Sequence, residues 1–384
     1  MKQKTTDRRG PLYSRGDRPG LARGVGPLAA PFSDVRKIAV LRGGGLGDLM
    51  FALPAVEALA AAYPAASITL LGTALHAALL ADRPGPVHRV EVLPAAPGIA
   101  AGSGDPQAVD AFLARMRQER FDLAVQVHGG GRNSNPFLLG LGARHSVGTR
   151  TPDAAALERS IPYIYYQHEV FRALEVAGLA GAAPVSLDAQ LPVLATESAA
   201  ARALLLPDRK LVTLHPGATD PRRRWPASCF AEVAVHAVAR GCQVVVVGDD
   251  ADRCLARQVA DLALAGAGPD APVRSLAGDL GIGTLAALLQ ASSVMVGNDS
   301  GPRHLAQAVG AATVGIYWFG NVVNAGAFGR TRHRVHMSWV SACPVCKADV
   351  TQVGWTAERC EHDDSFVAEV RASDVWADVD ELLG

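Results

Sequence analysis

The sequence predicts an α/β fold made of two doubly wound domains that face a central cleft. Three observations support this prediction. Apolar, strand-like runs alternate with helical patterns along most of the chain, two glycine-containing loops each join such a run to a helix, and the second half repeats the architecture of the first. Strands that alternate with helices imply parallel sheets whose ligand face lies at the strand ends. A chain of 384 residues can bury two separate cores.

Composition narrows the class of protein. Lys plus Arg and Asp plus Glu both number 37, so the charge balance indicates no nucleic-acid partner. No run approaches the roughly 20 apolar residues that a membrane-spanning helix needs. Six cysteines are too few for a disulfide scaffold, which favours a soluble protein of the reducing cytoplasm. Residues 1–33 are rich in Arg, Pro and Gly and are expected to form a disordered extension; its peripheral contact with a membrane is left open.

The first domain is expected to span residues 34–190, followed by a linker region at 191–209. Its first strand is Lys37–Leu41, and helical spacing then runs from Leu53 to Tyr63, with Pro54 either starting the regular helix or bending its first turns. Further strands are expected at 67–71, 89–93 and 122–127, and helices at 105–120 and 169–179. Polar and aromatic residues between 128 and 168 are weaker candidates for an acceptor pocket: His128, Arg132, Asn133, Asn135, Tyr163, Tyr165 and Tyr166.

The glycine-rich loop after the first strand does not fit a dinucleotide site. Gly43 and Gly45 match the first two glycines of G-x-G-x-x-G, but the third position is Asp48, and no acidic residue follows about 20 residues later. A carboxylate is a poor neighbour for a pyrophosphate. Asp48 is instead a candidate general base, held by a tight loop within reach of a hydroxyl. The alternative is that Asp48 only caps the first helix.

The second domain is expected to span residues 210–340. Its first strand, Leu211–Leu214, leads to a turn with three arginines at 222–224, which either binds a diphosphate or is a solvated basic turn. The strand at 242–247 is followed by carboxylates that could hold a ribose. Residues 276–279, a helix at 284–291 and strands at 294–296 and 313–318 are expected to complete the sheet of this domain.

The loop within Val296–Ala308 reads as strand, tight loop and helix N-terminus. Pro302 suits a first helical position, while Ser300 and Gly301 suit the cap. Free backbone N–H groups and the helix dipole then favour a phosphate or carboxylate, and His304 is expected to point toward the same place. The alternative is an ordinary capped helix.

Residues 341–384 are expected to hold a cysteine-containing segment and a terminal helix. The pattern C-x2-C-x13-C-x-H comprises Cys343, Cys346, Cys360 and His362. Thiolates and an imidazole at this spacing favour a structural Zn²⁺ or iron ion. Free thiols or a disulfide are the alternatives, and Asp363 or water could replace His362.

From about Lys37 to its C-terminus, the chain resembles glycosyltransferase family 9, the heptosyltransferase family. Three motifs carry the resemblance: GDLMFALPAVEAL, HPG followed by a basic residue and WP, and DSGPRHLAQAVG. The resemblance implies a GT-B fold with two Rossmann-like domains, acceptor bound mainly by the first and nucleotide-sugar by the second. It also implies inverting transfer without a catalytic metal. Some family members carry a cysteine-rich segment at the corresponding place.

The resemblance also implies roles for individual residues. Asp48 matches the family's general base, and Arg223 stands where the family commonly has Lys. Asp252 is the nearest match to an acidic donor-binding residue, with Asp249 and Asp250 as rivals. The remaining donor-binding candidates are expected to lie near the pyrophosphate: Thr219, Asp299, Ser300, Gly301 and His304.

Together these features predict an enzyme that transfers a heptose from ADP-heptose to an acceptor hydroxyl. The base draws a proton from the acceptor, positive groups stabilise the leaving diphosphate, and closure of the two domains assembles the site. Lipopolysaccharide core is the commonest acceptor that the resemblance implies, and glycoprotein and small-molecule acceptors are left open. The identity of the sugar, the base of the nucleotide and the oligomeric state are also left open. The alternatives are a non-catalytic nucleotide-sugar or carbohydrate-binding module and, less favoured, a dehydrogenase.

Overall fold

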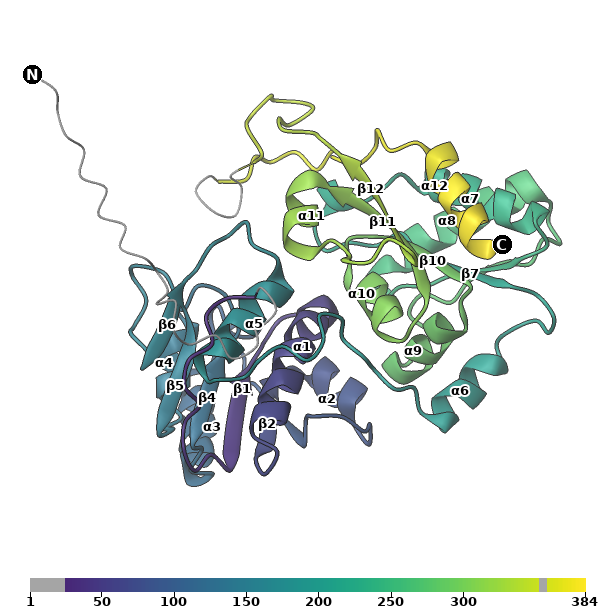
Figure 1. The fold of residues 1–384 in the computed structure, drawn as a ribbon. Helices are drawn as coiled ribbons and strands as arrows, with labels where there is room; N and C mark the ends of the chain where they lie inside the picture. Colours follow the sequence, from purple (N-terminus) through teal and green to yellow (C-terminus); the bar gives the residue numbers. More distant parts are fainter. Residues whose placement is uncertain (1–24, 352–357) are drawn as a thin grey trace, which may run out of the picture.

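Two six-stranded parallel sheets form the framework of the protein (Figure 1). The computed structural model describes residues 25–351 and 358–384. The strand order is β3-β2-β1-β4-β5-β6 in the first sheet and β12-β11-β10-β7-β8-β9 in the second. In both sheets the order reverses beside the first strand of the domain, so the carboxyl ends of the central strands frame a ligand crevice. The predicted α/β class with two doubly wound domains is confirmed.

The first domain follows the predicted alternation of strands and helices. Its strands are β1 (Lys37–Leu41), β2 (Ser67–Gly72), β3 (Arg89–Val92), β4 (Leu123–Gln126), β5 (His145–Arg150) and β6 (Arg159–Pro162). Its helices are α1 (Leu46–Ala62), α2 (Ala74–Leu80), α3 (Pro106–Gln118), α4 (Ser134–Leu139) and α5 (Glu169–Leu179). Helix α1 begins before Pro54 and contains it, which excludes one of the two alternatives for Pro54, that the regular helix starts there.

The second domain repeats the pattern. Its strands are β7 (Leu211–His215), β8 (Gln243–Val246), β9 (Val273–Ser275), β10 (Val294–Asn298), β11 (Ala312–Trp318) and β12 (His333–Ser338). Its helices are α7 (Ala227–Ala239), α8 (Arg253–Ala267), α9 (Ile282–Ala291), α10 (Gly301–Ala308), α11 (Phe319–Ala325) and α12 (Ala372–Leu383). Residues 276–279 lie after β9, so their assignment to the sheet is wrong; β9 pairs with β8 through Val273–Ser275 instead.

Two segments differ from their predicted character. Residues 25–33 belong to the predicted disordered extension, yet Val25 and Phe32 are buried and the Phe32 backbone N–H donates to the Tyr63 hydroxyl at 3.0 Å. The prediction of disorder is therefore wrong for residues 25–33, and residues 1–24 lie outside the described residues. The predicted linker contains helix α6 (Ala195–Arg202), whose buried Ala201 joins a small core with Leu288 of α9.

The largest apolar core crosses the domain boundary. Leu46 and Met50 of α1 belong to the same buried cluster as Leu305 and Ala306 of α10. In Figure 1, α1 and α10 lie next to each other where the two domains meet. Because both helices begin at the carboxyl ends of central strands, this contact brings their N-termini together. Along the described parts of the chain, none of the helices is both long and apolar enough to cross a membrane.

Candidate functional site

Asp48 sits in the first turn of α1, on the loop that follows β1. Gly45 is the N-cap, and its backbone N–H donates to Oδ2 of Asp48 at 2.8 Å. Gly44 has a φ of +88°, and a Cβ there would lie 2.4 Å from Oδ2, so the loop needs glycine at this position. The side chain of Asp48 is nevertheless 45% exposed. Asp48 thus caps the helix from its third position while keeping a face open to solvent.

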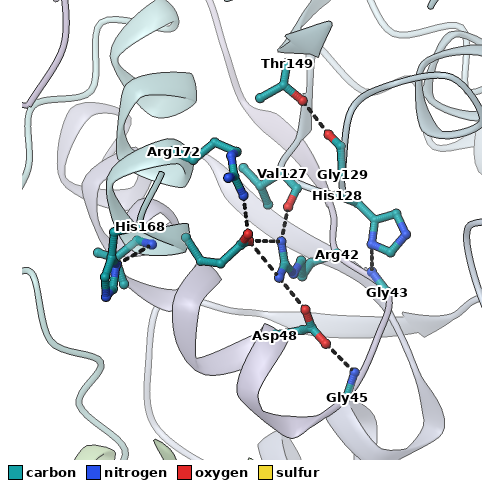
Figure 2. Close-up of polar contacts among 12 residues, drawn as sticks. Arg42, Gly43, Gly45, Asp48, Val127, His128, Gly129, Thr149, His168 and Arg172 are labelled. Atoms are coloured by element: carbon teal, nitrogen blue, oxygen red, sulfur yellow. Dashed lines mark hydrogen bonds and ion pairs between the residues drawn. The ribbon is translucent and has the colours of Figure 1, made fainter. Parts of the chain in front are cut away.

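The other oxygen of Asp48 binds Arg42. Arg42 Nη2 donates to Oδ1 across 2.5 Å, as Figure 2 shows. Burial alone would raise the pKa of Asp48, but the Arg42 charge and the hydrogen bonds from Gly45 and Arg42 outweigh it and hold the pKa below its usual value. Asp48 is therefore a carboxylate at neutral pH, the form that accepts a proton.

Arg42 is itself buried and belongs to a chain of alternating charges. Its guanidinium also donates to the Val127 carbonyl at 2.5 Å and to the Glu169 carboxylate at 3.2 Å. The other oxygen of Glu169 binds Arg172. Sequence analysis missed this set, although an arginine directly after a buried strand and a Glu at a helix start were visible in the sequence.

A polar hollow of about 480 Å³ opens beside this loop. Its lining comes from the loop after β4, from residues near β6 and from Gly98: His128, Gly129, Gly130, Gly131, Arg132, Asn133, Ser134, Thr151, Asp153, Tyr163 and Tyr165. His128 joins the hollow to the Asp48 loop, because Nδ1 accepts from the Gly43 backbone N–H at 3.2 Å. Most of the candidate acceptor residues from the sequence gather here, whereas Asn135 and Tyr166 are not among the lining residues.

The second loop lies at the start of α10. Ser300 is the N-cap and Gly301 the first helical residue, so Pro302 occupies the second position rather than the first. Asp299 is buried and accepts hydrogen bonds from three sides, from Arg223 at 3.3 Å, His304 at 3.0 Å and Asn321 at 2.8 Å. Burial would raise the pKa of Asp299, but His304, Arg223 and Arg303 together lower it.

His304 has both ring nitrogens engaged. The Arg303 guanidinium donates to Nδ1 at 2.5 Å, so the proton sits on Nε2 and is donated to Asp299. Burial and the Arg303 charge lower the pKa of His304 to about 4, against the opposing effect of Asp299. The ring also packs edge-on against Phe51 of α1, with centroids 4.5 Å apart. His304 is thus a neutral imidazole that connects the loop before α10 to the first domain.

The three candidate carboxylates after β8 separate in the structure. Asp249 caps the short helix Asp250–Asp252, and Asp250 pairs with Arg253. Asp252 turns inward, and its Oδ2 lies 3.2 Å from Nε2 of His215.

His215 connects Asp252 to the N-cap of α10. Its other ring nitrogen, Nδ1, lies 2.9 Å from the Ser300 hydroxyl. Burial opposes ionisation of Asp252, but the hydrogen bond and charge of His215 lower the pKa of Asp252. Thr219 lies exposed in the turn after β7. His215 is a second residue whose place in the site the sequence did not reveal.

The two loops meet at glycine residues. A Cβ at Gly301 would lie 2.8 Å from Cβ of Leu46, and one at Gly47 would lie 3.2 Å from the His304 ring. Asp48 follows Gly47 directly, so the exposed carboxylate of one domain adjoins the donor-loop candidates of the other. The arrangement can place a base beside a pair of positive helix N-termini, a combination suited to proton removal and anion stabilisation.

The three cysteines and the histidine of the C-x2-C-x13-C-x-H pattern lie close together in the structure, as predicted. One ligand atom each from Cys343, Cys346, Cys360 and His362 can be chosen so that all lie within 4.8 Å of one another. The cysteines are free thiols rather than disulfides, and Asp363 pairs with Arg359. Nδ1 of His362 is buried without a hydrogen-bond partner among the described residues. An unpaired buried imidazole nitrogen beside three thiols fits a metal ligand, and this cluster could bind a metal.

Comparison with known proteins gives a consistent set of similarities. The model of glycosyltransferase family 9 (heptosyltransferase) matches residues 109–345 of this chain. Lipopolysaccharide heptosyltransferase 2 of Salmonella typhimurium is 27% identical over 296 residues, which cover 73% of this chain and 82% of that protein.

Solved structures with low sequence identity share the fold. ADP-heptose LPS heptosyltransferase II of E. coli gives a TM-score of 0.70 at 21% identity, over 91% of this chain and 98% of that chain. TibC, a dodecameric iron-containing heptosyltransferase of enterotoxigenic E. coli solved in complex with ADP-D-β-D-heptose, gives a TM-score of 0.54 at 14% identity. That match covers 92% of this chain and 77% of TibC.

Proposed function

Because this chain belongs to glycosyltransferase family 9, the heptosyltransferase family, we propose that it transfers a heptose from ADP-heptose to an acceptor hydroxyl with inversion at the anomeric carbon. The observation that carries the proposal is the meeting of α1 and α10. It sets the exposed, ionised carboxylate of Asp48 next to a helix N-terminus whose N–H groups suit a diphosphate.

The donor diphosphate binds at the start of α10 in this proposal. The backbone N–H groups of Gly301 and its neighbours offer the positive end of the helix dipole, and Arg223 supplies a guanidinium that is 27% exposed beside it. Ser300 and Asp252 are linked through His215 and hold the loop from the other side. A relative solved with ADP-D-β-D-heptose supports the choice of donor.

Transfer proceeds as a single displacement. Asp48 removes the proton from the acceptor hydroxyl as its oxygen bonds to the anomeric carbon, and the bond from that carbon to the diphosphate oxygen breaks. The leaving ADP gathers negative charge, which Arg223 and the α10 N-terminus stabilise electrostatically. The acceptor occupies the polar hollow beside His128. Lipopolysaccharide core, a glycoprotein and a small molecule are the acceptor classes to compare.

The cysteine cluster holds a structural metal ion, Zn²⁺ or iron, in this proposal. Cys343, Cys346, Cys360 and His362 would be the ligands, and the ion would supply a cross-link between the two halves of the segment. TibC, which shares the fold, contains iron, and this supports the proposal that the cysteine cluster of this chain binds a metal ion. The catalytic step uses the side chains of the cleft and requires no metal.

Calorimetric titration tests the donor. The protein is titrated with ADP, GDP and UDP, each with and without an attached sugar, and we expect ADP to bind best and an attached heptose to tighten binding. Preference for another nucleotide would contradict the assigned donor.

Asp48→Asn tests the chemistry in the same protein. The amide keeps the side-chain shape and one acceptor oxygen but cannot take up the proton, so we expect transfer to be lost while ADP-heptose still binds. The exposed Asp110→Asn on α3 is the matched control. Undiminished transfer by the Asp48 variant would exclude its role as base, and donor binding without any transfer in the wild type would favour the non-catalytic module.

A further inference from the structure

We propose that Arg42 is a positioning residue that fixes the orientation of the Asp48 carboxylate, and that Glu169 limits how strongly Arg42 holds it. The proposal rests on Asp48 being the base of the transfer reaction. Arg42, Asp48 and Glu169 come from three separate elements, namely the residue after β1, the first turn of α1 and the first residue of α5. Neither Arg42 nor Glu169 touches the open face of Asp48.

Arg42 is anchored independently of Asp48. Its backbone N–H donates to the Leu71 carbonyl of β2 at 3.1 Å, and Nη1 donates to the Val127 carbonyl at 2.5 Å. Its side chain is only 7% exposed. Because the backbone of Arg42 is fixed by Leu71 and its buried guanidinium is fixed by Val127, the guanidinium cannot follow a moving carboxylate and defines where Oδ1 of Asp48 rests.

Two contacts in different directions then fix the Asp48 carboxylate. Oδ1 accepts from Arg42, and Oδ2 accepts from the Gly45 backbone N–H. Each carboxylate oxygen has two lone-pair positions, so one on each oxygen stays available to an acceptor hydroxyl. If only Gly45 held the carboxylate, it could rotate about the bond that joins it to Cβ. Because Gly45 and Arg42 both hold it, the edge of the carboxylate that is free to meet an acceptor hydroxyl keeps one direction.

Glu169 balances the charge of Arg42. Its Oε2 lies 3.3 Å from Nη1 and 3.2 Å from Nη2, on the guanidinium that also holds Asp48. A base must take up a proton during the reaction, and an unshared cation beside it would oppose that step. By sharing Arg42, Glu169 reduces this opposition, and Arg172 in turn keeps Glu169 in place.

The remaining titratable groups around Asp48 come from α2 and from the loop after β4. His76 binds the Gly45 carbonyl through Nε2 at 3.0 Å, and His128 binds the Gly43 N–H. Burial lowers the pKa of both imidazoles, so neither adds a full positive charge at neutral pH. Arg42 is therefore the main charge that lowers the pKa of Asp48, His128 adds a smaller effect in the same direction, and Glu169 with Arg172 acts through its contact with Arg42.

The two charged neighbours should shift the titration of Asp48 in opposite directions. Arg42→Met removes a cation, so the pKa of Asp48 rises by about 1 to 3 units, the usual influence of an adjacent cation on an Asp. The acid limb of kcat/KM moves to higher pH by the same amount. Glu169→Gln removes an anion and moves the pKa of Asp48 further down. A residue that only supports the fold would lower activity without moving either value.

The experiment compares wild type, Arg42→Met, Arg42→Lys and Glu169→Gln. For each, kcat/KM for transfer is measured from pH 3 to 8, so that the range includes the acid limb of the wild type, and the Asp48 carboxyl carbon is titrated by NMR over the same range in the ADP-bound protein. We expect Arg42→Met to lose at least 10-fold in kcat at pH 7 with the acid limb raised, an estimate based on the cost of a misplaced catalytic group. Arg42→Lys should restore the position of the limb, because it keeps the charge.

Arg115→Met on α3 is the matched control, because Arg115 is an exposed arginine that also pairs with a glutamate. If Arg42→Met leaves both the acid limb and the carbon titration where they are in the wild type, the proposal is overturned. If Arg42→Met does not fold, the titrations of Arg42→Lys and Glu169→Gln test the proposal instead. A rise in the pKa of Asp48 in Glu169→Gln would contradict it. The base assignment fails separately, by full turnover of Asp48→Asn.

Discussion

Gly47 and Gly301 face each other where the two domains touch. A Cβ added at Gly301 would lie 3.4 Å from the Gly47 backbone nitrogen and 2.8 Å from Cβ of Leu46. The two helix N-termini can approach this closely because Gly301 carries no side chain, whereas a Cβ at Gly47 would meet the His304 ring at 3.2 Å. The same approach sets Asp48 beside the loop before α10, so the proposed reaction geometry depends on the missing side chain of Gly301.

Gly301→Ala should therefore separate the two loops. The added methyl group meets Leu46 and backbone, which cannot move as freely as the end of a flexible side chain. We expect a loss of stability of about 1 to 3 kcal/mol and a larger loss of transfer than of ADP binding. Unfolding curves and steady-state kinetics measure both. Gly85→Ala is the control, since nothing lies within 4 Å of a Cβ there; equal effects in the two variants would contradict the prediction.

Much of the fold was predictable because the central strands are continuous apolar runs. Lys37–Leu41 was predicted with its observed bounds, and the helix at 169–179 likewise matches α5. The β5 segment HSVGTR and the β6 segment RSIP lack such a run, and their pairing depends on neighbouring strands instead. Tertiary context of this kind is not present in local sequence.

The site was predictable where one loop contains the whole signal. Asp48 and Ser300 follow directly from strand, glycine loop and helix start. Arg42 and Glu169 are 127 residues apart, and no local pattern indicates that the two side chains pair with each other beside Asp48. His215 was visible in the HPG turn, but its link between Asp252 and Ser300 depends on the parallel pairing of β7 with β8 and β10.

Arg223 should govern donor affinity. Its guanidinium lies 3.3 Å from Asp299 and is the partly exposed charge beside the α10 N-terminus. Arg223→Met removes a charge-assisted contact to the diphosphate, so we expect ADP to bind about 10- to 150-fold more weakly, equivalent to about 1.5 to 3 kcal/mol. Arg223→Lys keeps the charge and should recover part of the affinity. Calorimetry measures both variants.

The control for Arg223 is Arg257→Met, an exposed arginine on α8. Because Arg257 lines a hollow formed by other residues of α8, which include none of the donor-binding candidates, ADP affinity should stay at the wild-type value. Unchanged affinity in Arg223→Met would show that the diphosphate does not use this guanidinium.

His304 should make stability fall in mild acid. Its pKa is about 4 in the folded protein against 6.5 for an ordinary histidine, so the unfolded state binds the proton more readily. The contribution of His304 is complete above pH 6.5 and is lost as the pH falls toward 4. The difference corresponds to about 3 kcal/mol. His304→Gln keeps a donor for Asp299 and should lose less unfolding free energy between pH 7 and 4.5.

Urea unfolding at several pH values measures this effect. His333, whose pKa burial and the Arg303 charge also lower to about 4, should contribute in the same direction, so some pH dependence remains in the variant. A pH dependence in His304→Gln as steep as in the wild type would mean that His304 is not neutral in the folded protein.

Removing metal from the cysteine cluster should weaken donor binding. The Ser365 hydroxyl donates to the Arg224 carbonyl at 2.6 Å, and the Phe366 N–H donates to the Arg222 carbonyl at 2.7 Å. These contacts join the cluster's segment to the turn that carries Arg223. Because a metal ion would hold that segment together, its removal should loosen the turn and weaken ADP binding by about 5- to 150-fold, the usual range of coupling between two sites.

Elemental analysis first establishes the metal content of the purified protein, and calorimetry then measures ADP affinity before chelation, after chelation and after reloading. Linkage requires that ADP strengthen metal binding by the same factor, which competition with a chelator measures independently of activity. Cys360→Ser should reproduce the chelated state, whereas Cys254→Ser, an exposed cysteine on α8, should leave both affinities unchanged. Equal ADP affinity with and without bound metal would mean that the segment supports the fold alone, because the contacts to Arg222 and Arg224 would then persist without the ion.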